Sequence, residues 1–144
     1  MRIIIQDPQP GEDESIVINV RTMTDKLARV IDLLKSPNDI TVYADTQALM
    51  LPMSAVFYIE SVDLKTFVYA EKKVYRSRLK LYELEDVLDS TDFLRVSKQT
   101  IVNIRKIQSI APAGSGRFAA TLNNGELVII SRQFVPALKR RFGL

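Results

Sequence analysis

The chain has 144 residues, of which 47% are hydrophobic and 26% charged, with a mean hydropathy of +0.02 and a formal net charge of +3. These values exclude an intrinsically disordered chain, and the length is enough to bury a core without a disulfide or a metal. Because histidine and cysteine are both absent, serine–histidine and cysteine–histidine nucleophiles and zinc fingers are excluded. Carboxylate pairs, a serine–lysine arrangement and an all-oxygen metal site stay possible, but no site for chemistry emerges from the sequence, and we expect neither an enzyme nor a bound metal or cofactor.

The chain is expected to act in the cytoplasm. The absence of cysteine fits a reducing compartment. The apolar residues at the start are followed at once by polar residues and prolines, without the leader that secretion requires. Apolar runs such as residues 127–130 are far shorter than the roughly 18 residues of a membrane span, so no membrane insertion is expected.

Residues 1–39 are expected to form an N-terminal extension of two strands and one amphipathic helix. Short apolar runs at residues 3–5 and 16–20 flank an acidic loop with prolines and a glycine, a pattern typical of strands joined by a turn. Over residues 23–35 the apolar residues follow helical spacing, and Thr22 precedes them as a capping residue. We expect this stripe to be buried, either on the chain's own sheet or across a two-fold axis. Its residues are Leu27, Val30, Ile31 and Leu34.

From residue 40 onward the sequence predicts a series of short strands. Apolar runs separated by short polar turns are typical of a β meander. The expected strands are residues 40–44, 48–51, 56–62, 66–70 and 74–78. Helical spacing returns over residues 79–88, which predicts a short helix with a charged outer face. The expected fold class is mainly β with a few short helices.

The last third of the chain is expected to hold further strands and a terminal helix. The strands expected after residue 106 are residues 107–111, 117–122 and 127–130. The dipeptide Asn124-Gly125 is typical of a type I′ hairpin, because both central residues of that turn need a positive φ. A terminal helix is expected from Ser131 through Arg141, with Pro136 in its first turn.

Charge is distributed unevenly along the chain. Residues 1–92 hold 11 Lys and Arg against 16 Asp and Glu, whereas residues 93–144 hold 9 Lys and Arg against Glu126 as the sole acidic residue. The last third therefore carries a net charge of +8. Such a pattern is typical of a surface that binds a polyanion, most often nucleic acid, although a solvated basic face without a ligand gives the same count.

A polar segment rich in hydrogen-bond donors, residues 95–100, lies between two apolar runs of the basic third. If a loop carries it, its hydroxyl, amide and ammonium groups suit contacts with phosphates and base edges. A polar turn without a ligand is the alternative on the local sequence alone. Residues 114–116 are glycine-rich but lack the Lys and Ser or Thr that follow in a phosphate-binding loop, so a hairpin turn is expected there.

Residues 93–107 resemble the signature of LytTR-type DNA-binding domains, in which an aromatic residue and Leu-Arg precede a basic and polar stretch that ends on Val-Asn. Two further segments follow the family's order. Residues 56–66 resemble its characteristic strand and turn, and residues 127–133 resemble its last strand with the Ser-Arg that leads into the C-terminal helix. The resemblance covers roughly residues 40–141.

This resemblance implies a sequence-specific regulator of transcription, built from small antiparallel sheets, that sets loops rather than a recognition helix into successive major grooves of double-stranded DNA. The residues implied for DNA contact are Lys65 or Thr66 in the first loop, Ser97, Lys98 and Gln99 in the second, and Arg132 after the last strand. Several family members have a histidine at the first-loop position. Because this chain has Lys65 or Thr66 there, the base contact made through that histidine is not expected, whereas a contact with a DNA phosphate is still possible. Arg95 and Asn103 are implied to brace the fold.

We therefore expect residues 40–144 to form a LytTR-like DNA-binding domain and residues 1–39 to complete its core or to form a homodimer. The residues before the match are too few for a phosphoacceptor receiver domain. The alternative is a β-rich protein-interaction module whose basic face binds an acidic partner. An RNA-binding β domain is disfavoured because exposed aromatic stacking residues are not evident in the basic third. No sequence feature identifies a regulatory partner protein.

Overall fold

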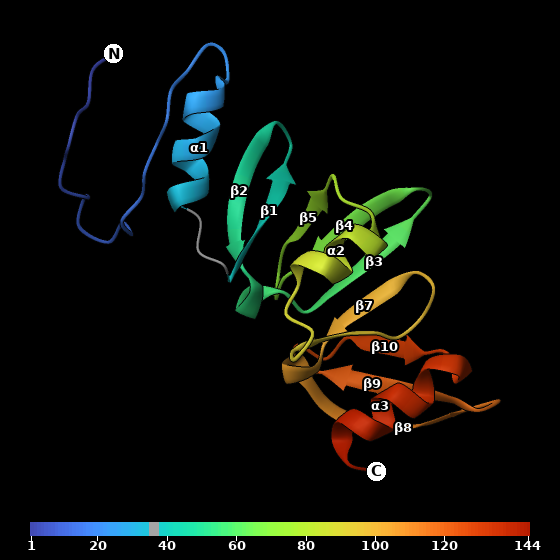
Figure 1. Ribbon diagram of the computed structural model, residues 1–144. Coiled ribbons are helices and arrows are strands. Elements are labelled where there is room, and N and C mark those ends of the chain that lie inside the picture. The colour runs from blue at the N-terminus through green and yellow to red at the C-terminus, as the bar shows by residue number, and fades with distance from the viewer. Residues whose placement is uncertain (35–37) are drawn as a thin grey trace. The chain divides into compact units, whose positions relative to one another are not determined.

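The structure, a computed structural model shown in Figure 1, describes residues 1–34 and 38–144. The chain divides into two compact units, Met1–Leu34 and Lys35–Leu144. Among the described residues, the second unit holds one seven-stranded and one three-stranded antiparallel sheet. The expected fold class, mainly β with short helices, is confirmed.

The first unit consists of an exposed segment without strands, followed by helix α1 (Asp25–Leu34). The expected strands at residues 3–5 and 16–20 are wrong, because neither run pairs with another strand in the described chain and their apolar side chains are exposed. β-branched residues favour a strand only where neighbouring strands complete the hydrogen-bond ladder and cover one face. Local composition alone could not supply that partner.

Helix α1 begins later than the sequence predicts. The hydroxyl of Thr24 accepts a hydrogen bond from the backbone N–H of Leu27 at 3.2 Å, so Thr24 rather than Thr22 is the N-cap. The predicted end of the helix at residue 35 lies outside the described residues.

Seven strands of the second unit form one antiparallel sheet with the spatial order β2-β1-β5-β4-β3-β7-β6. These strands are β1 (Asp39–Ala44), β2 (Gln47–Pro52), β3 (Tyr58–Val62), β4 (Lys65–Tyr69), β5 (Val74–Ser77), β6 (Phe93–Arg95) and β7 (Thr100–Asn103). Each of the five strands expected between residues 40 and 78 agrees with β1 to β5 within two residues at either end. A 3-10 turn, Met53–Ala55, joins β2 to β3.

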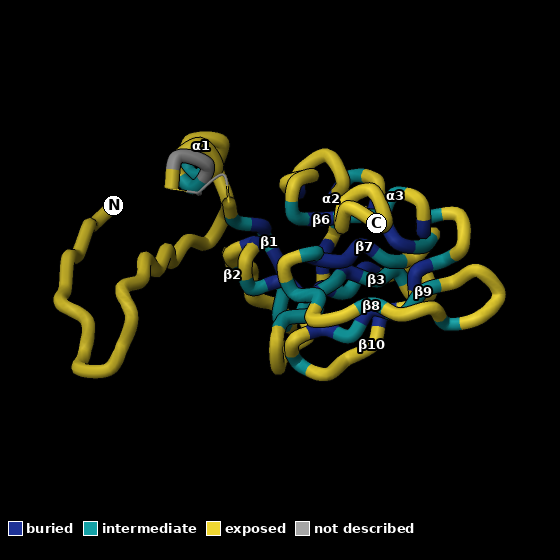
Figure 2. Tube along the Cα trace, turned by 90° about the horizontal axis from the view of Figure 1, so that it is seen from below, coloured by how far each residue is buried: buried dark blue, intermediate teal, exposed yellow. Residues whose placement is uncertain are grey.

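Helix α2 (Leu81–Val87) covers one face of this sheet (Figure 1). Alternation along β3, β4 and β7 directs Ile59, Val68 and Ile101 toward that face, where they are buried together with Leu84 of the helix. Figure 2 shows the buried residues concentrated along the strands of the second unit. Of the apolar stripe that the sequence predicts for residues 79–88, Leu81, Leu84 and Leu88 are buried in this first core, whereas Val87 is 49% exposed.

The second sheet follows β7 in the sequence, and its residues pack in one core with residues of β7. Its strands, in the order β10-β9-β8, are β8 (Ile107–Gly114), β9 (Arg117–Leu122) and β10 (Leu127–Ile130). The 3-10 turns Ile104–Lys106 and Arg132–Phe134 precede β8 and helix α3 (Val135–Phe142). Val102 of β7, Leu122 of β9 and Leu138 of α3 are buried in this second core. None of the described helices is long and apolar enough to cross a membrane.

The β9–β10 hairpin forms as expected, but its turn is not type I′. Gly125 has a positive φ of 89°, whereas Asn124 does not, and the Asn124 side chain instead accepts a hydrogen bond from the N–H of Glu126 at 3.1 Å. The N–H of Leu122 donates to the carbonyl of Glu126 at 2.8 Å, which closes a three-residue loop. Such a loop needs only one residue in the left-handed region, and glycine supplies it.

Candidate nucleic-acid interface

Two connections between strands lie side by side at one end of the seven-stranded sheet. The β3–β4 turn, residues 63–64, leads into Lys65 at the start of β4. The β6–β7 loop, residues 96–99, reaches the same end, because the N–H of Ser61 donates to the carbonyl of Gln99 at 2.8 Å. Two segments that are more than thirty residues apart in the sequence are therefore neighbours.

The β6–β7 loop is held in shape by Arg95, the last residue of β6. The Nε of Arg95 donates to the carbonyl of Ser97 at 2.8 Å, and its Nη2 donates to the carbonyl of Lys98 at 2.6 Å. The remaining nitrogen of the guanidinium pairs with Glu85 of α2. The hydroxyl of Ser97 accepts a hydrogen bond from the N–H of Gln99 at 3.1 Å. Arg95 therefore braces the loop and fixes the backbone that carries Lys98 and Gln99.

The predicted contact residues differ in how far they are exposed. Lys98 and Gln99 are exposed, whereas Ser97 is half-buried and its hydroxyl is engaged within the loop. Lys65 and Thr66, predicted to lie in the first loop, are instead the first two residues of β4. Lys65 is exposed, but Thr66 is only 5% exposed, so of these two alternatives Lys65 offers its side chain at the surface.

Arg132 is brought to the same end from the second sheet. The N–H of Ser131 donates to the carbonyl of Val96 at 2.8 Å, so the chain that leaves β10 lies against the β6–β7 loop. Arg132 is exposed, and its aliphatic stem lies on the β8–β9 turn, where a Cβ added at Gly116 would be 2.6 Å from the Cδ of Arg132. We call the β3–β4 turn with Lys65, the β6–β7 loop and Arg132 together the loop edge.

Two exposed arginines, Arg76 and Arg78, lie beside the loop edge but belong to none of the motifs found in the sequence. Arg76 lies in β5 and Arg78 follows that strand, while the buried Ser77 between them pairs with Thr66 of β4. Their spacing around Ser77 is the one sequence signal that they lie together, because residues two apart in a strand are on the same face of the sheet. The sequence does not indicate which strand pairs with β5; that is decided by the fold.

Two stacked tyrosines keep their hydroxyls neutral next to acidic groups. The rings of Tyr58 and Tyr69 are 4.2 Å apart between centroids. Burial, reinforced by Glu126, raises the pKa of the Tyr58 hydroxyl, and burial together with Glu60 raises the pKa of the Tyr69 hydroxyl. Both hydroxyls stay protonated at neutral pH and add no negative charge to the second unit.

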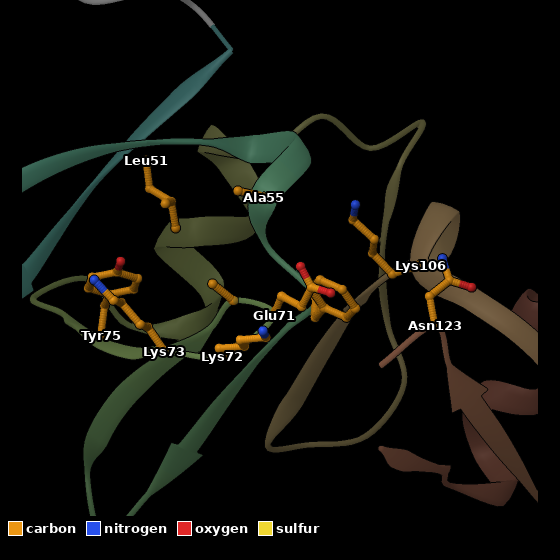
Figure 3. Close-up of a pocket in the computed structure, with 10 residues that line it drawn as sticks. Leu51, Ala55, Glu71, Lys72, Lys73, Tyr75, Lys106 and Asn123 are labelled. Atoms are coloured by element: carbon orange, nitrogen blue, oxygen red, sulfur yellow. The ribbon is translucent and has the colours of Figure 1, made fainter. Parts of the chain in front are cut away.

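A cavity of about 610 Å³ lies at the opposite end of the sheet from the loop edge. Figure 3 shows residues that line it. It is lined in part by Lys72 and Lys73 of the β4–β5 turn and by Lys106, whose Nζ lies 5.1 Å from the centroid of the Phe57 ring. Because β4 runs from Lys65 at the loop edge toward this cavity, the two features occupy different ends of one strand. The cavity therefore forms no part of the loop edge.

Comparisons with known proteins agree on one family. Residues 46–143 match the sequence profile of the LytTr DNA-binding domain. The chain is 27% identical over 139 residues to an HTH-type transcriptional regulator of Staphylococcus aureus, with 93% of both chains covered. It is 22% identical over 141 residues to the sensory transduction protein LytT of Enterococcus faecalis, covering 94% of this chain but only 58% of that protein.

A solved structure is similar as well. The LytTr DNA-binding domain of a Bacillus cereus protein superimposes with a TM-score of 0.71 at 29% sequence identity. The superposition covers 74% of this chain and 98% of that domain. The likeness therefore extends from the sequence to the fold.

Proposed function

The chain belongs to the LytTr DNA-binding domain family and is a DNA-binding transcriptional regulator without enzymatic activity, and we propose that it reads specific double-stranded sequences by setting the loop edge into successive major grooves. The observation that carries this proposal is the convergence onto one edge of Lys65 at the start of β4, Lys98 in the β6–β7 loop and Arg132 in the turn after β10. Flexible cationic side chains on short loops can reach phosphates and base edges. A regulator that acts on the chromosome works in the cytoplasm of a bacterium.

The helices of the second unit support a contact made by loops. Helix α2 holds three acidic residues and no basic one, and its Glu85 is paired with Arg95, so the helix offers phosphates no cation. Helix α3 is basic, but the Nζ of Lys139 lies 5.4 Å from the centroid of the Phe118 ring, and Arg141 donates to two backbone carbonyls of the α2–β6 loop. These contacts hold Lys139 and Arg141 against the second unit itself. The loop edge is therefore the better candidate for the DNA-binding surface.

Selection of bound duplexes from a random pool tests the proposal. We expect one site to be enriched, with an affinity whose log–log dependence on salt has a slope of about −4 to −5, because about four to six phosphate contacts would release counterions. Fluorescence anisotropy with the selected and a scrambled duplex measures both quantities. A slope near zero, or equal affinity for every duplex, would contradict the proposal and favour a protein-interaction module instead.

We further propose that residues 1–39 form a homodimer through α1, while residues 40–144 bind DNA. Half of the apolar stripe of α1 is accessible, since Val30 is 42% exposed and Leu34 is 48% exposed. Packing of this stripe on the same stripe of a second copy would remove both side chains from water. A two-fold dimer also presents two loop edges to two half-sites of one duplex.

Replacing both Val30 and Leu34 with serine is expected to raise the dissociation constant of the homodimer by about tenfold or more, since four apolar side chains leave the interface. The midpoint of thermal unfolding of the second unit should not change. Sedimentation velocity over a range of concentrations measures the first effect. Lys26→Ser with Arg29→Ser, on exposed positions of the same helix, is the control. An unmodified chain that stays monomeric on DNA would rule out this interface.

A further inference from the structure

Arg76 and Arg78 form a small basic and aromatic surface on the face of β5 and β4 that is opposite to the one buried under α2. The guanidinium carbon of Arg76 lies 5.2 Å from the centroid of the Phe67 ring, and that of Arg78 lies 4.1 Å from the centroid of the Tyr43 ring. Both arginines are exposed, and neither forms an ion pair within the described part of the chain. Their charge is therefore available to a ligand.

The strand register places these arginines next to the loop edge. Ser77, which lies between them, pairs with Thr66, and Thr66 follows Lys65 of the loop edge directly. In the order β5-β4-β3-β7, Arg78 is three strand positions from the β6–β7 loop. At a strand spacing near 4.8 Å this corresponds to roughly 14 Å along the edge.

This separation favours the phosphate backbone over base edges as the ligand. A major groove is about 12 Å wide, so a cation roughly 14 Å to the side of a loop in the groove faces the backbone that borders it. The guanidinium fork matches the oxygens of a phosphodiester, and stacking on a ring holds the fork in place before binding. Stacking of bases on these rings is disfavoured, because the guanidinium groups already cover Phe67 and Tyr43.

We propose that Arg76 and Arg78 form a phosphate-binding site that extends the DNA contact of the loop edge across β4 to β5. The proposal rests on the proposed function, because it takes the β6–β7 loop to lie in a major groove. The site contributes affinity without reading sequence, since phosphates are the same at every base pair. It also lengthens the protected stretch of duplex on the β5 side of the loop edge.

Substitution of both arginines with glutamine in the full chain tests this site. Binding is measured by anisotropy on the selected duplex, a scrambled duplex and the single strand, over a series of salt concentrations. We expect the affinity for both duplexes to fall by about five- to tenfold per arginine at about 0.1 M salt, and the log–log slope to become less steep by about two. The variant Arg76→Lys with Arg78→Lys should retain most of the slope, and thermal unfolding shows whether each variant folds.

The matched control removes two cations from the other end of the same sheet. Lys72→Gln with Lys73→Gln, in the β4–β5 turn, should leave affinity and slope unchanged. The site is overturned if the arginine variant binds like the unmodified chain while Lys98→Gln weakens binding, and the proposed function then stands. A loss confined to the selected duplex or to the single strand also overturns it. Salt-independent or absent duplex binding by the unmodified chain overturns both proposals.

Discussion

Replacing Asn103 with alanine is expected to lower the free energy of unfolding by about 2–4 kcal/mol, because two internal hydrogen bonds lose their partner at once. The Nδ2 of Asn103 donates to the carbonyl of Val56 at 2.8 Å, and its Oδ1 accepts a hydrogen bond from the N–H of Arg105 at 3.0 Å. The residue is only 2% exposed. It ties the start of β3 to the turn that leads into the second sheet, so its loss affects both cores. Urea unfolding followed by circular dichroism measures the change.

Asn123→Ala is the control for this substitution. Asn123 lies in the β9–β10 turn and is exposed, so its truncation should change the free energy of unfolding by less than about 0.5 kcal/mol. If Asn103→Ala is as mild as the control, water replaces the lost amide at no cost, and Asn103 does not brace the fold.

Replacing Arg132 with alanine is expected to cost about 1–3 kcal/mol of binding free energy on the selected duplex and little on a scrambled one. Its exposed guanidinium fork at the end of β10 suits a bidentate contact with guanine. Lys98→Ala should instead weaken binding to both duplexes and make the salt slope less steep by about one, because a lysine on a phosphate carries no sequence information. Anisotropy on both duplexes at two salt concentrations separates the two roles.

A pair of glycine substitutions checks the position of Arg132 without removing it. Gly114 and Gly116 both have positive φ, so alanine is strained at either place. Only at Gly116 would the new methyl group meet the stem of Arg132, and Gly114 has no neighbour within 4 Å. Gly116→Ala should therefore reduce discrimination between duplexes more than Gly114→Ala. If Arg132→Ala folds and keeps full discrimination, Arg132 reads no base.

The alternation of apolar and polar residues was sufficient to predict most strands of the second unit within about two residues, but β8 continues to Gly114, beyond the predicted end at residue 111. Each strand buries one face, and that requirement is written locally into the sequence. The same local rule failed for residues 3–5 and 16–20, where β-branched residues have no neighbouring strand in the described chain. It also failed for the β9–β10 turn, because the loop length, which pairing of the strands sets, decides how many residues need a positive φ.

The sequence by itself determined the family, the mainly-β class and the polar segment at residues 95–100, because these depend on local order and composition. Only the tertiary structure decided which of these residues reach a surface together. Thr66 and Lys65 are adjacent in sequence, yet Thr66 lies on the same buried face of β4 as Val68, while Lys65 is exposed. Arg76 and Arg78 adjoin the loop edge because β5 pairs with β4, and strand pairing is a long-range choice that no local pattern encodes.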